Sequence, residues 1–240
     1  MMIKLGNFLF RYRNSLFPIF YALLFIPSPP LTIHPWLAIS LGFLIALSGQ
    51  AIRITTIGLQ YIIRGGKNYK VYAEDLVTGG LFSHCRNPLY VGNILMILGL
   101  GIMANSLIFV TVVTPVFILF YQAIVSAEEH FLLDKFGEAY QSYQQNVNRW
   151  LPKLSGLSST LSSMRFNVRR AVLKEYNTTY IWTAAAVLVT TNTLYRSGGW
   201  PAVNVLLPYL ISAFVFLTLS YATVRYLKKS KRLVEVPLNQ

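Results

Sequence analysis

Long uncharged stretches divide the chain into segments that are long enough to cross a lipid bilayer. The longest covers residues 87–127, where 41 consecutive positions carry no Asp, Glu, Lys or Arg. Two more uncharged stretches cover residues 176–195 and 197–224. Because a membrane-spanning helix needs about 20 predominantly apolar residues, the longest stretch predicts two spans joined by a tight turn.

Along the whole chain, this pattern predicts an all-α fold, a polytopic membrane bundle of about six transmembrane helices. The first helix follows basic residues, as in a signal peptide, but no small-residue cleavage site comes after it, only Pro27-Ser28-Pro29-Pro30. We therefore expect an uncleaved helix. The predicted spans are residues 15–26, 34–61, 88–104, 106–127, 178–195 and 202–226.

The positions of the basic residues predict the orientation of this bundle. If the N-terminus is cytoplasmic, the outside loops are residues 27–33, 101–106 and 196–201, which together contain one basic residue, Arg196, of the 21 in the chain. Lys and Arg concentrate in cytoplasmic loops of membrane proteins. Both termini are therefore predicted to be cytoplasmic, in a bacterial inner membrane or an ER-like membrane.

The composition supports a membrane protein and changes the meaning of its positive charge. Hydrophobic residues make up 54% of the chain and charged residues 12%, against about 25% charged residues in soluble domains. The net charge of +13 comes from basic clusters beside the apolar spans, at residues 4–13, 64–70, 153–174 and 225–232. Such clusters predict anionic lipid headgroups as partners and argue against nucleic acid.

Two predicted cytoplasmic segments flank the hairpin of the third and fourth spans. Residues 62–87 are expected to form a loop, and residues 128–152 a helix, because apolar residues recur in the latter at spacings of three and four. Folding the hairpin at Leu107 returns Glu128 to the membrane face that holds Arg86. Charges at this depth are costly unless they are paired. The cluster is therefore either a structural cap, in which Arg86 pairs with a glutamate, or an active site.

The remainder of the chain is expected to form an appendage. The Ser-rich stretch 155–163 is typical of a linker. The basic residues 165–176 predict a helix that lies on the membrane surface. We therefore predict a core of residues 1–152, with four spans and a cytoplasmic site, followed by an appendage of residues 153–240 with two spans.

Two blocks of sequence on either side of the hairpin resemble one family. The first contains Gly66-Lys67-Asn68-Tyr69, Asp75-Leu76-Val77-Thr78-Gly79-Gly80-Leu81-Phe82 and Arg86-Asn87-Pro88-Leu89-Tyr90-Val91-Gly92-Asn93. The second contains Glu128-Glu129, Phe136-Gly137, Tyr140, Tyr143 and Pro152. Over about residues 42–152, the chain resembles the isoprenylcysteine carboxyl methyltransferase family in the order and spacing of these blocks.

The resemblance implies a small membrane bundle that binds S-adenosylmethionine from the cytosol and admits a lipid or lipidated acceptor, such as an isoprenylcysteine carboxylate or a phospholipid amine. The residues that it implies for cofactor binding are Leu81, Asn87, Pro88, Tyr90, Gly92, Asn93, Glu128 and Glu129. The residues that it implies for catalysis are Arg86, Glu128, Glu129 and Arg149. The family motif usually has His at the position of Asn87, and asparagine can form hydrogen bonds but cannot titrate.

The chemistry of this cofactor suits the residue types. S-adenosylmethionine carries a sulfonium, an ammonium and a carboxylate. Glu128 or Glu129 is expected to hold the ammonium, and Arg86 is expected to hold the carboxylate or to orient a glutamate. A carboxylate acceptor is ionised at neutral pH and needs only a cation to place it, Arg86 or Arg149, whereas an amine acceptor needs one of the glutamates as a base. The three histidines are scattered, so no metal is expected.

Two other functions remain open at this point. A membrane sterol-type reductase that uses NADPH has a similar Arg-x-Pro-x-Tyr block. That family, however, places an acidic residue soon after the motif glycine, where this chain has Asn93. The second alternative is a non-catalytic relative that binds a membrane lipid.

Three further polar residues receive structural interpretations. Arg53 lies inside the second predicted span and is expected to snorkel toward the cytoplasmic interface, with a role in the pocket as the alternative. Cys85 is expected to be an inert thiol. His84 is expected to be an ordinary loop residue.

Overall fold

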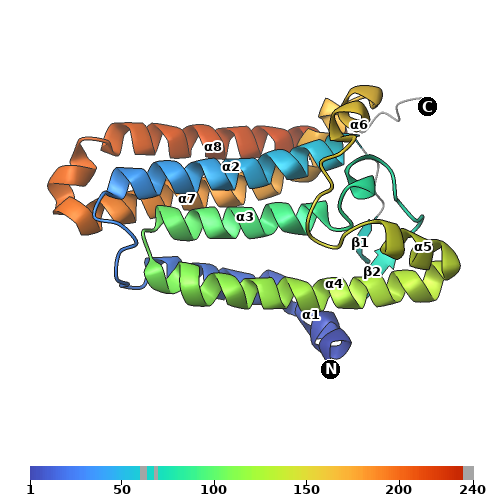
Figure 1. Cartoon of the computed structure of the whole chain (residues 1–240). Helices are drawn as coiled ribbons and strands as arrows, with labels where there is room; N and C mark the ends of the chain where they lie inside the picture. The colour runs from blue at the N-terminus through green and yellow to red at the C-terminus, as the bar shows by residue number, and fades with distance from the viewer. Residues whose placement is uncertain (60–63, 68–69, 235–240) are drawn as a thin grey trace.

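The computed structural model describes residues 1–59, 64–67 and 70–234, and helices make up most of this part of the chain (Figure 1). The predicted helical bundle is confirmed in its general form. The long and short α-helices are α1 Met2–Ala22, α2 Pro35–Leu59, α3 Pro88–Met103, α4 Thr114–Phe136, α5 Glu138–Asn146, α6 Leu157–Ser163, α7 Val168–Asn204 and α8 Leu207–Lys229. Short 3-10 turns cover Leu23–Phe25 (η1) and Gly80–Ser83 (η2), and a π-helical segment, η3 Phe109–Val113, precedes α4.

A short β-hairpin interrupts the predicted cytoplasmic loop. Strand β1 Arg64–Lys67 pairs in antiparallel register with strand β2 Lys70–Ala73, where the sequence predicted no regular structure. The hairpin, α5 and α6 gather at one end of the bundle (Figure 1). The end of the predicted span 34–61, and Asn68 and Tyr69 of the first sequence block, lie outside the described residues.

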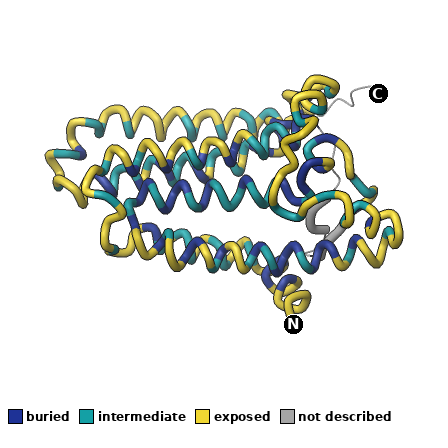
Figure 2. The backbone as a smooth tube through the Cα atoms, viewed as in Figure 1, coloured by how far each residue is buried: buried dark blue, intermediate teal, exposed yellow. Residues whose placement is uncertain are grey.

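Three of the described helices are long and apolar enough to cross a membrane, judged by length and composition. They are Pro35–Leu59, Phe109–Phe136 and Leu207–Lys229. Helix α3 is also apolar but has only 16 residues. Helix α8 has no buried residue and is exposed along most of its length (Figure 2), as expected for a helix in contact with lipid. The predicted count of six spans and the cytoplasmic position of both termini remain predictions.

The single helix expected over residues 128–152 is broken in two. Helix α4 ends at Phe136, and α5 begins at Glu138. Between them, Gly137 has a φ of +53°, and its N–H donates to the carbonyl of Leu133. This backbone conformation is open to glycine because it has no Cβ. The break at Gly137 therefore comes from the conformation of one residue, which the apolar periodicity did not reveal.

The segment expected to be an appendage is more regular than the sequence indicated. The predicted linker 155–163 contains helix α6. The basic residues 165–176 do not form a separate surface helix, because α7 begins at Val168 and continues into the bundle as far as a kink at Gly198 and Gly199. Helix α7 packs against α2 and α3. The division of the chain at residue 152 stays a prediction.

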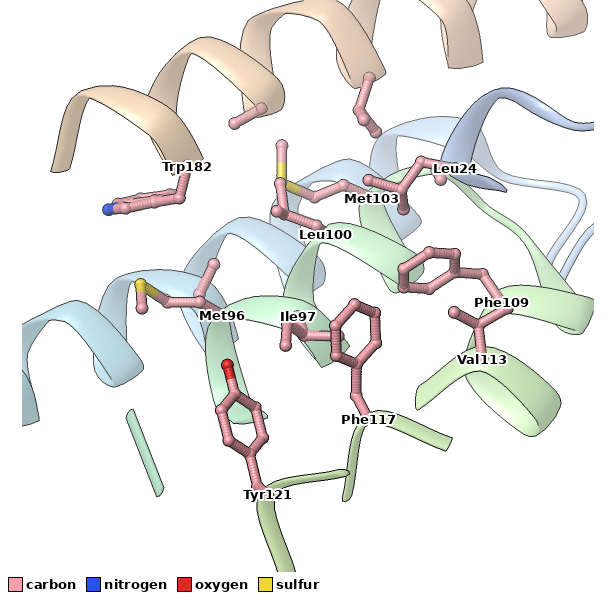
Figure 3. Packing of buried hydrophobic residues seen from close by; sticks show 14 of the residues in the cluster. Leu24, Met96, Ile97, Leu100, Met103, Phe109, Val113, Phe117, Tyr121 and Trp182 are labelled. Atoms are coloured by element: carbon pink, nitrogen blue, oxygen red, sulfur yellow. The ribbon is translucent and has the colours of Figure 1, made fainter. Parts of the chain in front are cut away.

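Large apolar side chains hold the helices together. Figure 3 shows Ile97 and Leu100 of α3 beside Phe117 of α4, all fully or almost fully buried in one cluster. The ring of Phe17 packs edge-on against Phe117, at a centroid distance of 5.2 Å, and so joins α1 to α4. Trp182 brings α7 into the same cluster. This core fixes α1, α3, α4 and α7 relative to one another.

Helices α2 and α3 touch backbone to backbone through two pairs of glycines. A Cβ atom added at Gly99 would lie 2.5 Å from the carbonyl oxygen of Gly42, and one added at Gly49 would lie 2.5 Å from the carbonyl oxygen of Gly92. Real Cβ atoms do not approach so closely, so no larger residue fits here without a backbone shift. Small residues promote this kind of close helix packing in membranes.

We predict that Gly99→Ala destabilises the protein, although the same change in an open helix stabilises it by about 1 kcal/mol. Overpacking of a tight contact costs roughly 1–3 kcal/mol or more. The measurement is thermal unfolding of the purified protein in detergent. Ala51→Val, at an exposed position of α2, is the control and is expected to change stability by no more than about 0.5 kcal/mol. Equal effects of the two changes would contradict the close contact.

Candidate functional site

A cavity of about 930 Å³ opens between α1, α2, α3, α4 and α7. Its lining combines polar and apolar groups. The polar side chains include Arg13 and Asn14 of α1, Asn177 and Thr178 of α7, and Arg53 of α2; the apolar ones include Phe17, Pro18, Phe25, Met96, Ile181 and Trp182. A ligand that has a polar end and an apolar body would match both parts of this lining.

Four residues predicted to bind the cofactor line this cavity. Three come from the start of α3 and one from α4: Asn87, Tyr90, Asn93 and Glu128. The Tyr90 hydroxyl donates a 2.6 Å hydrogen bond to Oε1 of Glu128. This bond joins α3 to α4 at the cavity wall and fixes the position of the Glu128 carboxylate.

The neighbouring Glu129 belongs to a buried ion cluster instead. Nη2 of Arg149 lies 2.5 Å from Oε2 of Glu129, and Nε of Arg86 lies 3.2 Å from Oε1. The side chain of Glu129 is only 4% exposed, and Glu129 is not among the residues that line the cavity. Successive residues of an α-helix point about 100° apart, so the two glutamates of α4 face different surroundings. The structure thus places Glu128 at the cavity and Glu129 between two arginines.

Asn87 connects the ion cluster to the cavity. Its Nδ2 donates to Oε1 of Glu129 at 3.4 Å and to the backbone carbonyl of Arg149 at 3.3 Å. Its buried Oδ1 has no hydrogen-bond partner among the residues that the structure describes. Asn87 also precedes the first residue of α3, and its backbone carbonyl accepts from Tyr90 and Val91. The Asn87 side chain, which lines the cavity, is therefore held in one orientation because its amide nitrogen is bound to the ion cluster.

The other predicted site residues lie behind the lining. Leu81 belongs to η2, Pro88 is the first residue of α3, and Gly92 contacts the stem of Arg53. None of these three lines the cavity, and neither does Arg86 or Arg149. Their predicted roles in binding and catalysis stay predictions.

Sequence reasoning missed a second charged network, built on Arg53. Its guanidinium pairs with Glu175 of α7, through Nε at 2.9 Å and Nη2 at 2.5 Å. The expectation that Arg53 snorkels to the interface is therefore wrong, because a buried carboxylate holds it inside the bundle. One signal was present in the sequence: Glu175 is the only acidic residue between positions 139 and 234.

His84 and Cys85 fasten the loop before α3 to the segment after α5. The ring Nδ1 of His84 donates to the carbonyl of Lys153 at 2.6 Å, and its Nε2 contacts the hydroxyl of Thr160 in α6 at 2.9 Å. Cys85 is buried beside the carbonyls of Arg149 and Trp150. His84 thus has a definite packing role and is more than an ordinary loop residue.

The comparisons with known proteins agree with the resemblance noted in the sequence. The sequence model of the family described as phospholipid methyltransferase matches residues 37–139. The cobalt-zinc-cadmium resistance protein CzcN of Cupriavidus metallidurans is 33% identical over 159 residues, which are 63% of this chain and 68% of CzcN. No solved structure matches the chain.

Several relatives carry the name protein-S-isoprenylcysteine O-methyltransferase. The one from Tribolium castaneum is 29% identical over 128 residues, which are 50% of this chain and 43% of that protein. The one from Mus musculus is 28% identical over 138 residues, which are 55% and 47% of the two chains. The chain thus spans less than half the length of these two methyltransferases. These similarities do not favour the reductase or the non-catalytic alternative.

We predict that Glu129→Gln strongly lowers stability. Removal of one partner from a buried ion pair costs roughly 3–5 kcal/mol, since the remaining charge loses its compensation. The measurement is thermal unfolding in detergent, without ligand. Glu138→Gln, the same change at an exposed position of α5, should alter stability by no more than about 0.5 kcal/mol. If both variants unfolded at the same temperature as the unchanged protein, the Glu129 carboxylate would not be what stabilises the cluster.

We also predict that Cys85 resists thiol labelling in the folded protein. Burial raises the pKa of the Cys85 thiol, although hydrogen bonding to the backbone of Asn87 and the charge of Arg86 oppose the shift. A raised pKa leaves less thiolate at neutral pH, and thiolate is the reactive form. Maleimide should therefore label Cys85 only after denaturation in SDS, whereas Ser155→Cys, at an exposed position, should be labelled at once. Rapid labelling of native Cys85 would contradict its burial.

Proposed function

The chain belongs to the phospholipid methyltransferase family of S-adenosylmethionine-dependent enzymes, and on this premise we propose that it methylates a lipid or lipidated acceptor in the cavity between α1, α3, α4 and α7. It is an integral membrane protein, as its apolar helices and its relatives indicate. The observation that supports the proposal best is the dual lining of the cavity. Glu128, Tyr90 and Asn87 lie at one part of it, and aromatic and aliphatic side chains extend through the rest.

Family membership implies S-adenosylmethionine as the methyl donor, and the polar residues of the cavity suit it. Glu128 carries the negative charge that an ammonium group requires. Within the described part of the chain, the buried acceptor Oδ1 of Asn87 and the buried donor Nε1 of Trp182 have no hydrogen-bond partner. Both residues line the cavity. Since an unsatisfied buried polar atom costs free energy, these two atoms suit a ligand that has both donors and acceptors.

The polar residues would hold and orient the reactants, while the donor supplies an electrophilic methyl group. Tyr90 fixes the Glu128 carboxylate through its 2.6 Å hydrogen bond, so Glu128 can grip an ammonium in a single orientation. Asn87 offers only hydrogen bonds, since it does not titrate. Methyl transfer requires alignment of two reactants and exclusion of water, and the buried position of these groups serves both.

The apolar part of the cavity supports an acceptor that belongs to the membrane. Phe17 and Pro18 line it from α1, Phe25 lines it from η1, and Ile181 and Trp182 line it from α7. An alkyl or prenyl chain would bury its surface against these side chains, which contributes about 25 cal/mol for each Å² removed from water. The distribution of basic residues supports a cytoplasmic position for the polar end of the cavity and contact of the bundle with anionic headgroups.

The charged residues near the cavity also suggest how an amine acceptor or a carboxylate acceptor would be held. Arg86 and Arg149, which the sequence suggested for placing an acceptor carboxylate, both pair with Glu129. Among the groups lining the cavity, Arg13 and Glu128 offer one charge of each sign. A carboxylate acceptor would use Arg13 as the cation that places it. An amine acceptor needs a base, and Glu128 can be that base only if it does not hold the ammonium of the donor.

The test is binding and transfer with detergent-purified protein. We expect S-adenosylmethionine and S-adenosylhomocysteine to bind in calorimetry, and NADPH not to bind. Glu128→Gln should weaken both by about tenfold or more, the effect of losing one charge-assisted hydrogen bond. Glu138→Gln is the matched control and should leave both affinities unchanged. Preference for NADPH, or no binding of any of the three, would refute the proposed function.

Transfer of a radiolabelled methyl group to membrane lipids then identifies the acceptor. A methyl ester, formed on a carboxylate, is released as methanol by mild alkali, whereas an N-methyl group resists it. We expect label in the lipid or lipidated fraction, with one of these two stabilities. Label confined to water-soluble compounds would contradict an acceptor from the membrane.

A further inference from the structure

The second charged network crosses three helices beside the cavity. Arg53 of α2 and Glu175 of α7 form an ion pair whose side chains are 12% and 3% exposed. Nε2 of Gln50 also donates to Oε2 of Glu175, at 3.3 Å. Arg53 itself lines the cavity. The pair therefore places a compensated charge at the wall of the proposed binding site.

The guanidinium of Arg53 is almost fully occupied by partners within the protein. Besides its two bonds to Glu175, its Nη1 donates to Oδ1 of Asn93 at 2.8 Å and to the carbonyl of Leu89 at 3.4 Å. The stem of Arg53 passes over Gly92, where an added Cβ would lie 2.6 Å from its Cγ. Arg53 therefore has little capacity left to bind a ligand directly. Arg53 therefore contributes to the cavity through its position and its positive charge.

The network also reaches the side chains that line the cavity. Asn93 accepts from Arg53, and Asn93 and Tyr121 of α4 both line the cavity. The ring of Tyr121 lies against that of Tyr90, at a centroid distance of 5.3 Å, and Tyr90 donates to Glu128. The network of Glu175 and Arg53 thus reaches Asn93, which lines the same cavity as Tyr90 and Glu128.

The charge of Arg53 matters for the ligand that the proposed function requires. S-adenosylmethionine carries a positive sulfonium, whereas S-adenosylhomocysteine has a neutral thioether at the same position. An uncompensated guanidinium at the cavity wall would repel the first more than the second, because electrostatic interactions are strong where water is excluded. Glu175 offsets that charge through two bonds.

We propose that Glu175 is a positioning residue of the cavity, which neutralises and orients Arg53 so that the cavity can hold a cationic sulfonium; this inference rests on the proposed function. Glu175 lies beyond residues 37–139, the part of the chain that the family model matches. Helix α7 is then part of the binding site and not only an anchor. The other residues that α7 contributes to the lining, such as Asn177 and Trp182, agree with this role.

The test compares the affinities for S-adenosylmethionine and S-adenosylhomocysteine in four proteins by calorimetry. They are the unchanged protein, Glu175→Gln, the double variant Arg53→Gln/Glu175→Gln, and Lys174→Gln. Lys174 is the exposed neighbour of Glu175 on α7, so its variant controls for the loss of one charge from the same helix. The quantity of interest is the ratio of the two affinities in each protein.

We expect Glu175→Gln to weaken S-adenosylmethionine relative to S-adenosylhomocysteine on the order of tenfold. The double variant should restore the ratio of the unchanged protein, because it removes both charges, and Lys174→Gln should not alter the ratio. A purely structural role would weaken both ligands equally. An unchanged ratio in Glu175→Gln, or a ratio that the double variant fails to restore, would overturn the inference.

If Glu175→Gln does not fold, Arg53→Gln takes its place. This variant leaves a negative charge, so it should raise the preference for S-adenosylmethionine, and an unchanged or lower preference would overturn the inference.

Failure of the proposed function and failure of the role of Glu175 give different results. If the unchanged protein binds neither ligand, the proposed function is wrong, whereas binding of both with no shift of the ratio refutes only the role of Glu175.

Discussion

A charged side chain inside an apolar bundle must be paired, and this constraint organises the whole structure. Two pairings among the described residues show how it is met: Glu129 lies between Arg86 and Arg149, and Glu175 holds Arg53. Each joins segments that are far apart in the sequence. The first joins the two ends of the α3–α4 hairpin to the segment after α5, and the second joins α2 to α7. Removal of any partner would leave a charge in surroundings that cannot solvate it.

The geometry of the cavity follows from these pairings. Because Glu129 is held by two arginines, its neighbour Glu128 is directed to the cavity and is fixed there by Tyr90. Arg53 can reach across α3 only because Gly92 has no side chain. The close contact of α2 and α3 through glycines therefore serves the site as well as the packing. The wall combines polar groups with aromatic and aliphatic side chains, as an amphiphilic acceptor requires.

Helix α7 is part of the cavity although it lies late in the chain. From the sequence, the last two helices look like an attachment to a core that carries all the chemistry. In the structure α7 packs along α2 and α3, lines the cavity with Trp182 and Asn177, and supplies the partner of Arg53. The part of the chain that matches the family model thus forms its cavity together with α1 and α7, which lie outside the matched residues.

The sequence by itself determined the helical class, the apolar segments and the meeting of Arg86 with the glutamates, because these depend on local composition and on one hairpin. It did not reveal the break at Gly137, where one backbone conformation overrides an apolar repeat. It gave Glu128 and Glu129 equal roles, since only packing shows that one faces the cavity and the other two arginines. The pair of Arg53 and Glu175 is separated by 122 positions. Only the tertiary structure decides such a contact, because no periodicity encodes which buried charges meet.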